Sequence, residues 1–88
     1  MPIRIVWHND ALQELASIWM KTDVRASITS VSRQIDLDLS DKPLTKGRPA
    51  GDGLYSFRVP PLDVLFDFRP KDQVVEILAI REVRPDRN

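Results

Sequence analysis

Three arginines in the C-terminal half of the chain could stabilise negative charge at a reacting phosphate. Arg58, Arg81 and Arg84 are the cations of the predicted strand region. Cleavage of a phosphodiester without a metal needs such cations to stabilise the phosphorane, together with a base for the attacking hydroxyl and an acid for the leaving oxygen. Arginine is a poor acid or base, because its pKa lies above about 12. The alternative is that Arg58 and Arg81 pair with carboxylates on a solvated sheet face. Those carboxylates are Asp63, Asp67 and Glu82.

A second group of cations could bind a target or a phosphate backbone. Lys46 and Arg48 lie in a glycine-bearing segment, and residues 42–58 hold four cations against the single carboxylate of Asp52, a local surplus of three. With Arg58, these two residues form the best basic patch of the chain. The alternative is a solvated cationic loop.

Other catalytic and metal-binding arrangements find little support. The chain has no cysteine and a single histidine, His8, which we expect to cap a helix or lie on the surface. Asp63 and Asp67 are separated by roughly 13 Å along a strand, too far for paired-carboxylate chemistry. The three glycines precede a predicted strand rather than a helix, unlike a nucleotide-binding fingerprint. We therefore expect no metal and no cofactor.

The composition predicts one small domain over residues 1–88. The chain has 13 basic and 13 acidic residues, so its formal net charge is zero, and 42% of its residues are hydrophobic. A neutral chain lacks the general cation surplus of nucleic-acid-binding proteins. Its longest apolar run is four residues, far short of the roughly 20 that a membrane span needs. We expect a soluble, cytoplasmic protein without a membrane partner.

The hydrophobic pattern predicts an α+β fold in the order β-α-α-β-β-β. A β-branched and aromatic run indicates a strand over residues 3–7, and apolar residues at helical spacing predict helices over 9–20 and 24–40. Asn9 is the expected N-cap of the first helix. Residues 41–53, which hold all three glycines, are the expected main loop. Three antiparallel strands follow over 54–59, 62–68 and 73–83, the last of them central because it is apolar on both faces. We expect the helical hairpin to cover one sheet face and the two tryptophans to join the core.

The order and spacing of several segments resemble the RelE/ParE superfamily of bacterial toxins. These segments are residues 6–15 (VWHNDALQEL), 54–59 (LYSFRV), 61–68 (PLDVLFDF) and 74–80 (VVEILAI). The resemblance implies a stress-linked toxin of a type II toxin–antitoxin system, held inactive by a cognate antitoxin. Family members either cleave mRNA in the ribosome or block DNA gyrase. The family's strand arginine corresponds to Arg58.

Departures from the family favour binding over cleavage. The ribosome-dependent nucleases are strongly basic, whereas this chain is neutral. They have an additional arginine on the strand that matches residues 62–68, where this chain has Asp63, and a C-terminal tyrosine, whereas Tyr55 is the only tyrosine here. We therefore favour a gyrase-type binding activity. One alternative is ribosome-dependent mRNA cleavage that uses Arg58, Arg81 and Arg84, and another is an inactive, partner-binding member.

The open face of the sheet is the predicted partner surface. Leu65 lies between two aspartates on the face opposite the main apolar stripe, and we expect Leu78 and Ile80 to join it there. An antitoxin segment or a second copy of the chain would explain such a patch.

Overall fold

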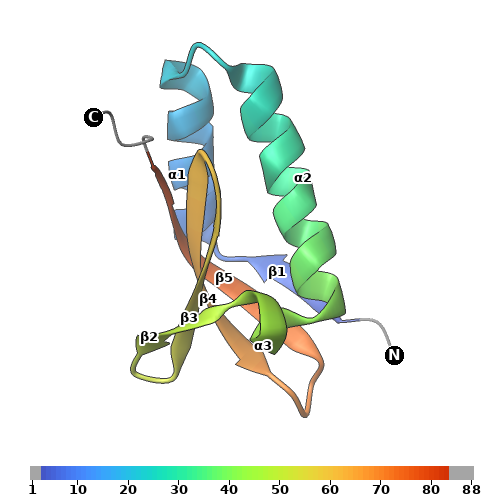
Figure 1. Cartoon of the computed structure of the whole chain (residues 1–88). Coiled ribbons are helices and arrows are strands. Elements are labelled where there is room, and N and C mark those ends of the chain that lie inside the picture. The colour runs from blue at the N-terminus through green and yellow to red at the C-terminus, as the bar shows by residue number, and fades with distance from the viewer. Residues whose placement is uncertain (1–2, 84–88) are drawn as a thin grey trace, which may run out of the picture.

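Eight secondary-structure elements make up the fold in this computed structural model, which describes residues 3–83. Figure 1 shows α1 and α2 side by side, joined by a short turn. The elements are β1 (Arg4–Trp7), α1 (Asn9–Lys21), α2 (Arg25–Asp41), α3 (Pro43–Lys46), β2 (Arg48–Gly51), β3 (Leu54–Val59), β4 (Leu62–Arg69) and β5 (Val74–Glu82). The α+β class and the order of the main elements agree with the sequence prediction.

Side chains from outside helix α1 satisfy backbone groups at both of its ends. At the start, His8 Nδ1 accepts from the backbone N–H of Asp10, so the N-cap is His8 and not Asn9 as predicted. At the end, the Arg25 guanidinium donates to the carbonyl oxygens of Trp19 and Met20, at 3.0 and 3.1 Å. Because the last carbonyls of a helix have no partner within it, Arg25 both stabilises the end of α1 and fixes the turn into α2.

The segment predicted as the main loop instead contains a short helix and a strand. Pro43 opens α3, where its missing N–H costs no helical hydrogen bond. Strand β2 pairs antiparallel with β3, and Asp52 and Gly53 form the two-residue connection with φ angles of +56° and +77°. An Asp-Gly dipeptide tolerates these positive angles and is a strong hairpin signal. The antiparallel meander therefore has four strands rather than three.

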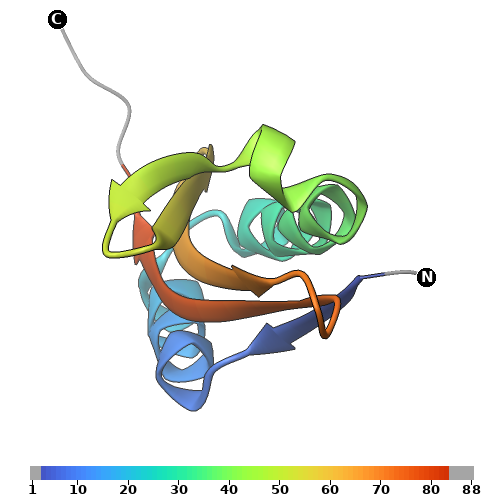
Figure 2. The same ribbon diagram turned by 90° about the horizontal axis from the view of Figure 1, so that it is seen from below.

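The five strands form one sheet in the order β1-β5-β4-β3-β2. β1 pairs in parallel with β5, and the other neighbours are antiparallel. The predicted central position of β5 is confirmed, since this strand lies between β1 and β4. In Figure 2 the long helices α1 and α2 are seen nearly end-on, and β2 and β3 lie above β5, on the same side of this strand as α2.

A register shift in β5 changes which side chains face the helices. Leu65 is paired with Ala79, but the next residue of β4, Phe66, is paired with Ile77, so Leu78 has no partner in β4. One extra residue reverses the alternation of all side chains beyond it. Ile80 is therefore in the core with 4% of its surface exposed, which corrects its predicted place on the open face.

One hydrophobic core joins both helices to a single face of the sheet. Helices α1 and α2 contribute Ala11, Ile18, Ile28, Ile35 and Leu39, and the sheet contributes Leu62, Val64, Phe66, Val75, Ile77 and Ile80. Trp7 packs against this core as predicted, and its Nε1 donates to Asp36 Oδ1 at 2.8 Å. This hydrogen bond ties the edge strand β1 to α2.

We predict that the Gly47→Ala substitution destabilises the fold by about 1–3 kcal/mol, the usual cost of overpacking. The φ angle of Gly47 is −81°, which alanine adopts freely. A Cβ there would lie 2.6 Å from Phe66 Cζ, inside the core. Urea unfolding followed by circular dichroism measures the loss.

A double-mutant cycle controls for other effects of the alanine. In a Phe66→Leu background the ring is gone, so Gly47→Ala should cost clearly less than in the natural chain. An equal cost in both backgrounds would contradict the clash with Phe66.

Candidate functional site

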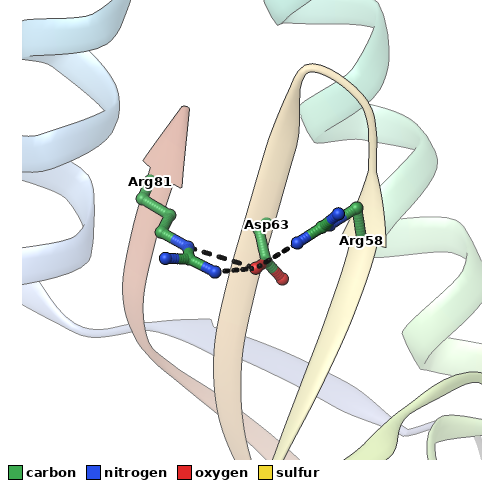
Figure 3. Close-up of polar contacts among 3 residues, drawn as sticks. All are labelled: Arg58, Asp63 and Arg81. Atoms are coloured by element: carbon green, nitrogen blue, oxygen red, sulfur yellow. Dashed lines mark hydrogen bonds and ion pairs between the residues drawn. The ribbon is translucent and has the colours of Figure 1, made fainter. Parts of the chain in front are cut away.

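Two arginines and an aspartate form a row across three adjacent strands on the open face of the sheet (Figure 3). Asp63 of β4 lies directly opposite Arg58 of β3 on one side and Arg81 of β5 on the other. Directly opposed residues of antiparallel strands place their side chains on the same face. Arg81 belongs to this face only because it follows the register shift at Leu78.

Both arginines converge on one carboxylate oxygen. Arg81 donates to Asp63 Oδ2 from Nη2 at 3.0 Å and from Nε at 3.2 Å. Arg58 Nη2 lies 3.7 Å from the same oxygen, too far for a hydrogen bond, so that this pair is held by charge. The Asp63 side chain is only 11% exposed, whereas both arginines are more than half exposed. The row has a net charge of +1 and keeps N–H donors available to a ligand.

The row lies at the junction of two adjoining hollows. The first, with a volume of about 460 Å³, contains the row and has an apolar floor that includes Ala50, Leu65 and Ala79. The second, of about 510 Å³, is lined by Lys46, Arg48 and Arg58 and shares Arg58, Asp63 and Ser56 with the first. The fold thus brings together the three cations of the predicted basic patch and joins them to Arg81.

The other predicted site residues have different locations. Leu65 lines the first hollow, whereas Leu78 is half-buried at the register shift and Ile80 packs in the core. Arg84 lies outside the described residues. Sequence reasoning placed Ile80 on the open face because the apolar run over residues 74–80 gives no sign of the shift.

The two hollows can bind anions, but they contain few groups for proton transfer. Among residues 3–83, the titratable side chains that line them are Lys46, Arg48, Arg58, Asp63 and Arg81. General acid–base catalysis near neutral pH relies mostly on histidine, carboxylates or other groups with matched pKa values. Asp63, the only carboxylate among these side chains, is paired with two arginines. Tyr55 does not line either hollow, and its ring stacks on that of Phe66 with 5.7 Å between the ring centroids. The arrangement is suited to binding rather than to proton transfer.

Neither a metal centre nor a membrane span is found in the part of the chain that the structure describes. Residues 3–83 contain no group of three or more potential metal-ligating side chains among histidine, cysteine, aspartate and glutamate. No helix among them has the length and apolar character needed to cross a bilayer.

An apolar groove between α1 and α2 is a second candidate surface, which sequence reasoning missed. Trp19 was expected in the core, but its side chain is exposed at the groove and the Arg25 guanidinium lies 5.0 Å from its ring centroid. The groove has a volume of about 320 Å³ and is lined by Leu12, Leu15, Ala16, Trp19, Met20, Ile28, Thr29 and Ser32. The sequence did contain a signal for this groove, because the apolar stripe on α1 is wider than the part of the helix that packs against the core.

Comparison with known proteins relates the fold to toxins over its whole length. No family model matches the sequence, and no curated protein matches it. Among solved structures, the toxin–antitoxin complex RelBE2 from Mycobacterium tuberculosis has a chain that is 25% identical, with a TM-score of 0.78 over 98% of this chain and 95% of that one. The chromosomal ParDE toxin–antitoxin system of P. aeruginosa gives 17% identity and a TM-score of 0.68, over 93% and 97% of the two chains.

A third match shows that the same fold occurs inside a different protein. TrmO from P. aeruginosa is 20% identical with a TM-score of 0.62 over 92% of this chain, but only 33% of the TrmO chain is covered. The toxin structures, in contrast, match nearly end to end.

We predict that Asp63→Asn changes the free energy of unfolding by less than about 1 kcal/mol, because both arginines stay solvated when their partner is neutralised. The change in unfolding free energy caused by Asp63→Asn should be smaller at a salt concentration of about 1 M, because salt screens exposed charges. Urea unfolding at low and high salt measures both effects. A loss of several kcal/mol would show that the row stabilises the fold rather than being available for binding.

Proposed function

We propose that this chain, which has the RelE/ParE toxin fold, is the toxin component of a type II toxin–antitoxin system. The observation that supports this is the end-to-end match to toxin–antitoxin structures, with 98% of this chain and 95% of the RelBE2 chain covered. We further propose that the protein arrests growth by binding a cellular target, such as DNA gyrase, through the two cationic hollows.

The charge and chemistry of the hollows favour binding as the mode of action. The chain has no net charge, but within residues 3–83 the two hollows are lined by four cations and by the single carboxylate of Asp63. A nuclease would also need groups that move protons, and the hollows lack histidine and tyrosine side chains among the described residues. Recognition of an anionic surface needs only the cations and the shape of the hollow.

Ribosome-dependent mRNA cleavage is the second candidate, because one specific feature favours it. Arg58 and Arg81 lie on either side of Asp63 in the first hollow, where two cations could stabilise a phosphorane. Inhibition of supercoiling by purified gyrase and cleavage of mRNA on programmed ribosomes are separate assays that distinguish the two targets.

We propose that a cognate antitoxin places an amphipathic helix in the groove between α1 and α2. Large apolar side chains are exposed along this groove, and such a stripe on a small domain marks a protein-binding surface. Because the groove is formed by the helices and the hollows lie on the open sheet face, one chain can offer separate surfaces to the antitoxin and the target.

We predict that induction of this chain alone arrests bacterial growth and that Arg58→Ala relieves the arrest, because loss of one charge contact commonly weakens binding to a target by about tenfold or more. Colony counts after induction measure the relief. The matched control is Arg69→Ala. Arg69 is also on the sheet and is 56% exposed, compared with 54% for Arg58, but it lies outside both hollows.

Arrest that persists equally in both variants would remove Arg58 from the site. Unimpaired growth with the natural chain, with the folded protein confirmed in the cells, would favour the inactive, partner-binding alternative.

We predict that Met20→Glu abolishes rescue by a co-expressed cognate antitoxin, while toxicity remains. Met20 is 67% exposed at the groove, so a carboxylate there is tolerated by the fold but would be desolvated under a bound helix. Leu37→Glu is the control, because Leu37 is 59% exposed on α2 and does not line the groove. Normal rescue of Met20→Glu would place the antitoxin elsewhere.

A further inference from the structure

We infer that the first hollow binds an acidic, partly apolar segment of a partner protein, and that Asp63 is an internal competitor for the same arginines. This inference rests on the proposed function only in taking the hollow as the binding surface. It adds the chemistry of the ligand and names the residue that limits binding.

The ion pairs of the row show which ligand the arginines accept. A carboxylate already occupies the space between Arg58 and Arg81, with 11% of its side chain exposed. Arg81 holds this group by two hydrogen bonds to one oxygen, but Arg58 contacts it only by charge at 3.7 Å. No hydrogen bond from the Arg58 side chain to another described residue accompanies this pair. Arg58 therefore keeps its donors for a second carboxylate that enters the hollow.

The floor of the hollow favours a protein segment over a nucleic acid. Leu65, Ala50 and Ala79 provide an apolar surface beside the cations, on which an apolar side chain next to an acidic one can rest. Proteins that bind single-stranded nucleic acid without sequence preference commonly stack bases on aromatic side chains. Within residues 3–83 the one aromatic residue that lines either hollow is Phe57, and it packs against the core.

Asp63 must weaken this binding, because the ligand brings a charge of the same sign. With Asp63 ionised, the row presents a net charge of +1, and an incoming carboxylate is repelled by the one already present. Neutralising Asp63 leaves +2 in the same place and weakens the hold on the Arg81 N–H groups, because a neutral amide oxygen is a weaker acceptor than a carboxylate. The row is thus set for weak contact with single acidic residues, and a tight partner must supply further contacts on the apolar floor.

The test is a binding assay on the purified full chain with a fluorescein-labelled peptide of alternating glutamate and leucine, followed by anisotropy. Asp63→Asn should bind this peptide about fivefold more tightly than the natural chain, the effect of roughly 1 kcal/mol. Asp67→Asn is the matched control. It changes the net charge by the same amount on the same strand, but Asp67 pairs with Arg69 rather than with the row.

Two further measurements make the outcome decisive. The added affinity of Asp63→Asn should vanish in the Asp63→Asn, Arg81→Gln double variant, whose folding is checked by circular dichroism. Equal affinity in Asp63→Asn and Asp67→Asn would overturn the inference, as would a preference of Asp63→Asn for a labelled oligouridylate over the peptide. These assays use no cells, so a failure here leaves the growth-arrest result standing, and a failure of growth arrest leaves the peptide result standing.

Discussion

The single extra residue of β5, Leu78, is the constraint on which both the core and the candidate site depend. Without it, Ala79 and Arg81 would continue the alternation of Val75 and Ile77 and face the helices. An unpaired guanidinium in the core would cost several kcal/mol. The shift instead sends Ile80 into the core and puts Arg81 beside Asp63. One backbone irregularity therefore completes the hydrophobic layer and assembles the charged row.

The sheet separates two surfaces of different character. The helix-covered side ends in an apolar groove between α1 and α2, and the open side presents cations around Asp63. An apolar groove contributes affinity through burial, whereas exposed cations contribute mainly to the selection and orientation of a partner. A small neutral domain thus presents two surfaces of unlike chemistry.

Most of the framework was predictable from the sequence, because its signals are local. The expected strand over residues 54–59 corresponds to β3, and two-sided apolarity correctly placed β5 inside the sheet. Asp52-Gly53 was a usable hairpin signal for β2 that the glycine-rich composition obscured. The register shift was not predictable, since an apolar run satisfies either register and only the packing of the helices decides between them. Trp19 was misplaced because periodicity identifies an apolar stripe but not how much of it finds a partner.

The two tryptophans lie in unlike surroundings, and this gives the molecule two optical probes. The Trp7 indole packs against the core and is hydrogen-bonded to Asp36 across the interface of β1 and α2, whereas Trp19 lies in the open groove under the Arg25 guanidinium. Fluorescence from Trp7 follows the docking of strand to helix, and fluorescence from Trp19 follows occupation of the groove. Since the chain has only these two tryptophans, replacing either one by phenylalanine leaves a single tryptophan reporter, and no label is needed.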